Sequence, residues 1–247
     1  VILVSGATDS NAAFYASGAC KLGDWASTIG TTLAVKGLSA EKITDQGGRI
    51  YCHKHPDGIW LPGGASNAGA EIIRQKFSGR EQHIEELLKK SDLSVKGLLY
   101  PSVRLGERLP VANKEFKPFQ TIEDSTDEQL YLACLEGIAY TEKMVFDLLH
   151  QLGANTGGEL FAMGGTTQSI LGLQTRADVH QKCIHIPAHP NSAFGAAILA
   201  AAGYRNQTVG ETSKAMVQVV REIEPRCNFD DYHASKYFGF KDLCLSN

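Results

Sequence analysis

Asp9 is the side chain in this sequence that is best placed to accept a proton. It follows an apolar run at residues 1–4 and a turn at residues 5–8, and it precedes residues 12–20, which have a helical composition. A carboxylate between a predicted strand and a predicted helix can take the proton of a hydroxyl group while that hydroxyl is phosphorylated. The same position also suits an aspartate that caps the helix, and position alone favours the cap.

Three glycine-rich segments could bind phosphate: Gly30-Thr31-Thr32, residues 63–69 and Gly164-Gly165-Thr166-Thr167. Each follows a predicted strand, and the last two precede a predicted helix. Such turns expose backbone N–H groups, and a helix start adds a partial positive charge. A single glycine-rich turn is more often a plain helix end or hairpin. Three such turns, two of which have threonine hydroxyls beside the glycines, favour a nucleotide site.

The common phosphate and nucleophile motifs are absent. Residues 63–69 carry neither the lysine of a P-loop nor the G-x-G-x-x-G spacing of a dinucleotide fold. The segment Gly64-Ala65-Ser66-Asn67-Ala68 lacks the closing glycine of G-x-S-x-G, which argues against an α/β-hydrolase. The six cysteines are scattered without a C-x-x-C pair, so zinc ribbons and dithiol redox chemistry are not expected. The spacing of the histidines indicates packing or surface positions rather than metal ligands; they are His53, His55, His180, His185 and His189.

Composition limits the class of protein. The chain has 247 residues, 43% of them hydrophobic, and a net charge of −3, which excludes a disordered chain and a nucleic-acid binder that relies on massed positive charge. No apolar run approaches the ~20 residues of a membrane span. Unpaired cysteines indicate a reducing, cytoplasmic compartment. The apolar start without an initiator Met or a signal peptide suggests a piece of a longer polypeptide.

Hydrophobic patterning predicts the elements around these residues. Expected strands cover residues 1–4, 25–28, 33–38, 49–53, 58–61, 159–163 and 183–187, and expected helices cover residues 68–77, 80–90, 126–152, 166–177 and 192–202. Ser125 and Glu128 fit a capping box for the long helix, and Gly153 fits its end. Residues 101–126 read as irregular loop. The β-α-β-α order at residues 159–202 predicts a parallel layer, joined to a hairpin-rich antiparallel part.

The aromatic C-terminal tail is predicted to pack back onto its own domain rather than to bind a partner. Its members are Phe229, Tyr232, Tyr237, Phe238 and Phe240.

In this order along the chain, Asp9, the three glycine-rich segments and Gly195-Ala196-Ala197 resemble the C-terminal half of FGGY-family carbohydrate kinases. Ser5-Gly6-x-x-Asp9 resembles the family segment that holds the catalytic aspartate. The block from Trp60 to Asn67 is most similar to the plant and cyanobacterial D-ribulokinase branch, formerly called xylulose-kinase-like. The resemblance covers nearly the whole chain, and it implies an α/β lobe of the actin-like ATPase (ASKHA, ribonuclease H-like) fold, with a mixed sheet flanked by helices.

The resemblance also implies residue roles in ATP-dependent phosphorylation of a sugar hydroxyl. Asp9 would be the general base and would lie near Mg²⁺, with Ser10 beside it at the sugar. Gly30, Thr31 and Thr32 would hold the β- and γ-phosphates, and Gly69 would let the following helix approach the nucleotide. The adenosine and α-phosphate side would be lined by Gly164, Gly165, Gln168 and Ser169.

The family's N-terminal half, with most of its sugar contacts, is not found in residues 1–247. The resemblance therefore implies a nucleotide-binding lobe that needs its own N-terminal domain and has little or no kinase activity alone. D-Ribulose is the expected acceptor; a xylulokinase, another FGGY sugar or polyol kinase, or a nucleotide-binding lobe without turnover are the alternatives. A homodimer is an open alternative for the assembly, no nucleic acid or membrane partner is expected, and a plastid location replaces the cytoplasm if the source is a plant.

Overall fold

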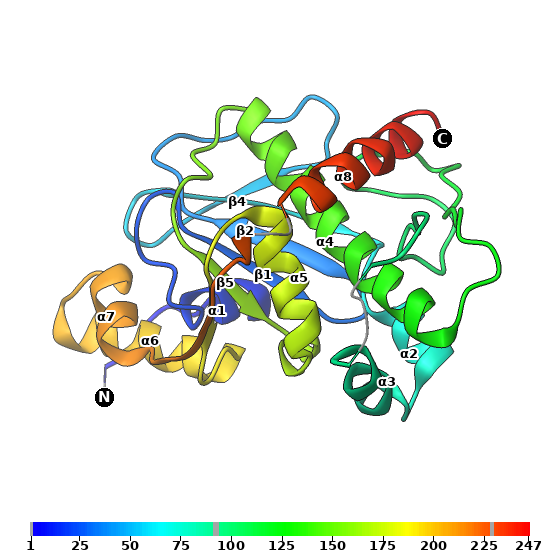
Figure 1. Cartoon of the computed structure of the whole chain (residues 1–247). Helices are drawn as coiled ribbons and strands as arrows, with labels where there is room; N and C mark the ends of the chain where they lie inside the picture. Colours follow the sequence, from blue (N-terminus) through cyan, green and yellow to red (C-terminus); the bar gives the residue numbers. More distant parts are fainter. Residues whose placement is uncertain (1, 91–93, 228–229) are drawn as a thin grey trace.

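The computed structural model describes residues 2–90, 94–227 and 230–247, and it contains a seven-stranded mixed sheet with helices on both faces (Figure 1). The strand order is β3-β4-β2-β1-β5-β6-β7. The strands are β1 (Trp25–Ile29), β2 (Leu33–Gly37), β3 (Tyr51–Lys54), β4 (Trp60–Ser66), β5 (Leu160–Met163), β6 (Ile184–Pro187) and β7 (Val219–Ile223). The helices are α1 (Asp9–Tyr15), α2 (Glu71–Phe77), α3 (Glu81–Leu88), α4 (Asp127–Gln151), the short 3₁₀ helix η1 (Gly165–Gln168), α5 (Ile170–His180), α6 (Ser192–Arg205), α7 (Val209–Met216) and α8 (Asp230–Leu245).

The sheet joins an antiparallel half to a parallel half, as the sequence predicts. β1 pairs with β2 as a tight hairpin, and β2 and β3 each pair antiparallel with β4. On its other side β1 lies parallel to β5, which lies parallel to β6. β7, which the sequence pattern does not predict, adds an antiparallel strand at the edge. The predicted fold class is confirmed.

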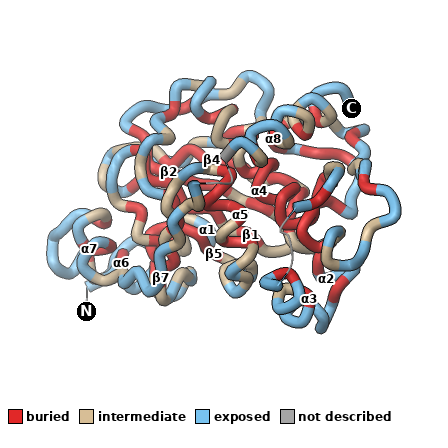
Figure 2. The backbone as a smooth tube through the Cα atoms, in the orientation of Figure 1, coloured by how far each residue is buried: buried red, intermediate tan, exposed pale blue. Residues whose placement is uncertain are grey.

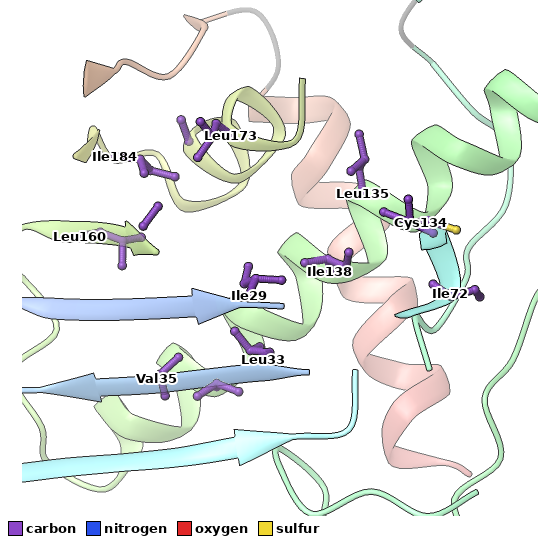
Figure 3. Packing of buried hydrophobic residues seen from close by; sticks show 14 of the residues in the cluster. Ile29, Leu33, Val35, Ile72, Cys134, Leu135, Ile138, Leu160, Leu173 and Ile184 are labelled. Carbon is purple, nitrogen blue, oxygen red and sulfur yellow. The ribbon is translucent and has the colours of Figure 1, made fainter. Parts of the chain in front are cut away.

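Alternate side chains of the central strands enter two cores. Ile29, Leu33 and Val35 face the larger core, where α4 and α5 supply residues such as Ile138 and Leu173 (Figure 3). The long helix α4 is buried along much of its length (Figure 2) because it lies between the sheet and its neighbours α5 and α8. On the opposite face, sheet residues that include Ala26, Phe161 and Met163 pack with residues of α1 and α6 in a second core. Each fully buried aliphatic side chain contributes about 1.5–3 kcal/mol to folding.

Two predicted elements near the N-terminus are wrong. Residues 2–4 form no strand and are exposed, because no described strand lies beside them to complete the backbone hydrogen bonds; residue 1 lies outside the described residues. The first helix begins at Asp9 and ends at Tyr15 instead of covering residues 12–20. Its C-cap is Ala16, and Gly18, two residues further on, adopts a φ of +97°.

Three further differences concern local signals. Gly63 and Gly64 lie inside β4 instead of forming a turn. The capping box of α4 uses Thr126 and Gln129 instead of Ser125 and Glu128; both pairs fit the pattern, one residue apart. The predicted helix at 166–177 is divided at Ser169 into η1 and α5, because the Ser169 hydroxyl accepts from Gly172 N–H and starts a new helix there.

The C-terminal tail packs onto the same chain, as predicted. Tyr237 and Phe240 are buried beside Tyr140, and the Tyr232 hydroxyl donates to Glu136. Phe238 is 66% exposed, and Phe229 lies outside the described residues. Among the described residues, no helix combines the length and the apolar character that a membrane crossing requires.

Candidate functional site

The turns after β1 and β5 leave the same edge of the sheet. The two strands are parallel neighbours, so the turn at Gly30 and the turn at Gly164 begin side by side. The chain then continues in opposite directions, from β1 to β2 on one side and from β5 through α5 to β6 on the other. In open α/β sheets, ligands bind in the crevice outside the carboxyl ends of strands where the connections diverge in this way. The topology therefore places a ligand crevice at these two turns.

The two turns are fixed to each other by close contacts. Gly164 adopts a φ of +88°, and a Cβ atom there would lie 2.5 Å from the carbonyl oxygen of Ile29. The Thr166 hydroxyl donates to that same oxygen at 3.2 Å. Glycine is required at position 164 because no side chain fits between the turn and the end of β1. These contacts fix the position of the two turns relative to each other at the crevice.

A cleft of about 910 Å³ opens at these turns. Its walls come from the turns themselves, from α2 and α3, and from the sides of α4 and α5. The predicted nucleotide-binding residues that line it are Gly30, Thr31, Gly165, Gln168 and Ser169. Thr32, Gly69 and Gly164 do not line it. A smaller cavity of about 280 Å³ lies at the opposite end of β1 and β5, lined by residues that include Trp25, Lys143 and Lys182.

Gly69 shapes the cleft without lining it. A Cβ atom at Gly69 would lie 2.5 Å from the carbonyl oxygen of Thr31, so glycine lets the start of α2 close onto the first turn. The next residue, Ala70, donates its N–H to the Gly30 carbonyl oxygen at 2.9 Å and lines the cleft. The Gly30 N–H donates to the Thr32 carbonyl oxygen at 3.1 Å within the hairpin. Because the Gly30 N–H is already hydrogen-bonded, we expect Thr31 to make the phosphate contact from this turn.

Ser169 is engaged in a hydrogen-bonded group that spans the cleft. Its hydroxyl donates to Glu85 Oε1 of α3 at 2.6 Å, and the Tyr131 hydroxyl of α4 donates to the same oxygen at 2.7 Å. Burial and the Glu85 carboxylate together raise the pKa of Tyr131 well above its usual value, so the phenol remains a donor. This group fixes α3 as one wall, which gives Ser169 a structural function as well as a position at the site.

Sequence reasoning missed the side chains that α2 and α3 bring to the cleft. Arg74 and Lys89 supply positive charge, Gln82 supplies an amide, and Glu81, Glu85 and Glu86 supply carboxylates. The sequence signal for these helices is an ordinary polar, solvated pattern, which gives no indication that they border a ligand.

Asp9 lies in the first helical turn of α1 and does not cap the helix. The N-cap is Thr8, whose side chain makes no cap hydrogen bond, and Asp9 Oδ1 accepts from the neighbouring Ser10 N–H at 2.7 Å. Among the described residues no Lys, Arg or His pairs with this exposed carboxylate. Asp9 is not among the residues that line the cleft. The capping interpretation is wrong, and a solvent-accessible carboxylate remains.

Helix α1 is anchored by its packing against α6. A Cβ atom at Gly195 would lie 1.7 Å from the Ala12 carbonyl oxygen, so the two backbones touch at a point where only glycine fits. The Ser213 hydroxyl of α7 also donates to the Tyr15 carbonyl oxygen at 2.8 Å. These contacts fix the position from which Asp9 projects.

Two groups of side chains have the chemistry of metal ligands. Mg²⁺ takes one or two carboxylates together with phosphate oxygens, and the exposed Asp9 carboxylate fits that requirement. Separately, donor atoms of Cys183, which directly precedes β6, of His185 on β6 and of Glu222 on β7 lie within 4.8 Å of one another. His185 there contacts Glu222 at 3.2 Å and Glu159 at 2.6 Å.

The comparisons with known proteins agree on one family. Residues 25–204 match the model of the FGGY family of carbohydrate kinases, C-terminal domain. A gluconokinase from Bacillus subtilis is 29% identical over 214 residues, which cover 79% of this chain and 42% of that protein. A xylulose kinase from Staphylococcus xylosus is 27% identical over 200 residues, 76% of this chain and 41% of that protein. The chain thus spans less than half the length of the curated relatives it matches.

Solved structures show the same fold. The crystal structure of xylulose kinase from Rhodospirillum rubrum superposes with a TM-score of 0.80 at 24% identity, over 97% of this chain and 50% of that chain.

Proposed function

Because the chain belongs to the FGGY family of carbohydrate kinases and matches its C-terminal domain, we propose that it is the nucleotide-binding lobe of an ATP-dependent sugar kinase. The observation that carries the proposal is the cleft at the carboxyl ends of β1 and β5, where two backbone turns meet helices that bring Arg74 and Lys89. ATP binds there with its phosphates toward Thr31 and Gly165 and its adenosine toward Gln168 and Ser169.

Asp9 acts as the general base of the transfer. It takes the proton of the acceptor hydroxyl as the hydroxyl oxygen bonds to the γ-phosphorus and the bond to the bridging oxygen breaks, so that ADP leaves with the electron pair. The absence of an ion-pair partner among the described residues leaves this carboxylate free to meet a substrate. Asp9 would hold Mg²⁺ together with the phosphates, and the ion would supply neutralising charge at the transferring group. Ser10, next to Asp9, contacts the sugar.

The acceptor that we propose first is a ketopentose, D-ribulose, followed by D-xylulose. It is supported by the resemblance of residues 60–67 to the D-ribulokinase branch. Gluconate is the competing acceptor, because curated relatives are named gluconokinases. Gly63 and Gly64 lie in β4, and the residues that line the cleft do not include them, so any effect of this block on the sugar is indirect.

We propose further that the chain needs an N-terminal lobe to turn over. The chain spans less than half the length of its curated relatives, and kinases of this kind exclude water by closing two lobes over the substrate. The lobe by itself then binds nucleotide and releases little or no ADP.

The test is ADP release with ATP, Mg²⁺ and a panel of D-ribulose, D-xylulose and gluconate, carried out on the protein at its natural length and on residues 1–247. The proposal predicts the highest kcat/KM with D-ribulose at natural length and little turnover by residues 1–247. A higher kcat/KM with gluconate would contradict the proposed acceptor and leave the proposed kinase activity standing. If no sugar promotes ADP release at natural length, the proposed function fails.

A further inference from the structure

Lys36 is a buried lysine on the face of β2 that turns toward α1. Its neighbours Leu33 and Val35 enter the larger core, so Lys36 projects from the opposite face of the sheet. Only 7% of the residue is exposed. Lysine is almost never buried to this degree unless its charge is paired.

The Lys36 ammonium ends at the residues that follow Asp9. It donates to the Asn11 side-chain oxygen and to the Ser10 hydroxyl, the latter at 3.4 Å. Burial lowers the pKa of Lys36 to about 8, and the negative charge of Asp9 acts in the opposite direction. Within the described part of the chain, no carboxylate forms an ion pair with this ammonium. An ammonium has three N–H donors, so one remains beyond these two contacts.

Lys182 shows what a structural lysine looks like in the same molecule. Burial also lowers the pKa of Lys182, but its ammonium donates to the backbone carbonyl oxygens of Thr156 and Gly158 just before β5. That contact joins two backbone segments. Lys36 instead holds two side chains beside the proposed general base.

Attachment of α1 to the sheet does not explain Lys36. The contact of Ala12 with Gly195 and the hydrogen bond from Ser213 to Tyr15 already fix the helix. Those contacts lie in the middle and at the end of α1. Lys36 instead donates hydrogen bonds to Ser10 and Asn11 in the first turn. The burial of a charge at this point thus serves the orientation and the electrostatics of residues 9–11.

We propose that Lys36 is a positioning residue for phosphoryl transfer: it holds Ser10 and Asn11, and through them orients the Asp9 carboxylate toward the acceptor hydroxyl, with a positive charge alongside. The inference rests on the proposed function. Asp9 still receives the hydroxyl proton, and Lys36 exchanges neither a proton nor a bond in the step. A misplacement of the reacting groups by about 1 Å can cost about 100-fold in rate.

The test compares Lys36→Met with Lys36→Arg and with the matched control Lys182→Met, all at natural length. Lys36→Met is expected to lower kcat about 100-fold and to leave the KM for ATP within about twofold, while Lys36→Arg restores part of the loss. Lys182→Met is expected to lower Tm without changing kcat. If Lys36→Met does not fold, Asn11→Ala removes the same contact from the other side and is expected to lower kcat about tenfold.

Two results overturn the inference in distinguishable ways. In the first, the wild-type protein is active and Lys36→Met, or Asn11→Ala in its place, keeps the wild-type kcat or loses kcat only in proportion to the loss of folded protein. That result contradicts the inference and leaves the kinase function standing. A wild-type protein that phosphorylates no sugar overturns both.

Discussion

The cleft and the packed interior use the same residue types in opposite ways. A Cβ atom added at Gly30 or Gly165 in the cleft would have no neighbour within 4 Å, whereas a Cβ at Gly63 would lie 2.6 Å from the Val35 carbonyl oxygen. Asp9, the proposed general base, is exposed and has no ion-pair partner among the described residues, whereas Glu142 in α4 is fully buried and paired with Arg176. Gly63 and Glu142 are thus enclosed by their neighbours, whereas a Cβ atom at Gly30 or Gly165 would meet open space and the Asp9 carboxylate is exposed. Groups that packing does not explain are the strongest candidates for ligand binding.

The largest expected effect is at Asp9. Asp9→Asn keeps the shape of the side chain but cannot accept the proton, so kcat should fall about 10³-fold, within the usual range for a general base. Tm should not change, because the Asp9 side chain makes only a local contact to Ser10 N–H. Steady-state kinetics and thermal unfolding of the same samples measure both.

Asp127→Asn is the matched control for this variant. Asp127 also occupies the first turn of a helix and is exposed, but it pairs with Arg80 and does not line the cleft. Its kcat should match the wild-type value. Equal kcat for the two variants would remove Asp9 from the mechanism.

In the packed region, Glu142→Gln should cost stability instead of activity. Burial acts to raise the pKa of Glu142, but the nearby Arg176 and His180 outweigh it and hold the pKa well below its usual range. Removing this charge leaves a buried guanidinium uncompensated, which costs about 3–5 kcal/mol in the free energy of unfolding. Urea unfolding measures the loss, and the double variant Glu142→Gln/Arg176→Met should recover part of it. No loss of stability would mean that this pair does not hold α4 to α5.

One glycine substitution in the cleft and one in the packed interior compare the two regions. Gly165→Ala adds a methyl group to the cleft without a clash, so Tm should stay the same while the Kd for ATP rises about tenfold, or about 1.4 kcal/mol. Gly63→Ala should lower stability by about 1–3 kcal/mol and leave the Kd unchanged for the folded fraction. The opposite assignment of the two effects would break the distinction between cleft and interior.

The smallest effect is a pH dependence of stability from His233. Burial lowers the pKa of His233 to about 4, from 6.5 in the unfolded chain. Above pH 6.5 the residue is neutral in both states and has no effect. As the pH falls from 6.5 toward 4, the unfolded state binds a proton that the folded state does not, so stability decreases by at most about 1.4 kcal/mol per pH unit.

His233→Asn removes that dependence while retaining a partner for the Tyr140 hydroxyl. Unfolding curves between pH 6.5 and 4.5 should therefore be flatter for this variant, and the exposed His150→Asn should follow the wild type. If the free energy of unfolding falls with decreasing pH equally for His233→Asn and the wild type, another group causes the loss of stability at acidic pH.

The sequence predicted the sheet better than the site. The hairpin at Gly30 and the β-α-β-α order are local patterns, and they determine both halves of the sheet. Glycine is ambiguous in sequence because it marks an open turn at Gly165 and a close strand contact at Gly63. Only the packing of Val35 against β4 distinguishes the two.

The walls of the cleft could not be predicted for a related reason. Arg74 and Glu85 come from polar helices whose position beside η1 depends on tertiary contacts, such as the hydrogen bond from Ser169 to Glu85. The burial of Lys36 was equally invisible, because its place opposite α1 depends on the registers of β1, β2 and β4.

The central claim is that a nucleotide binds in the cleft at the ends of β1 and β5, and the most direct test is to locate the bound nucleotide on this chain. Backbone amide NMR spectra of residues 1–247 with a non-hydrolysable ATP analogue and Mg²⁺ would locate it residue by residue. Binding at the cleft predicts the largest shift changes at Gly30, Thr31, Gly165 and Gln168. Changes centred on the smaller cavity at Lys143 and Lys182, or none at saturating nucleotide, would contradict it.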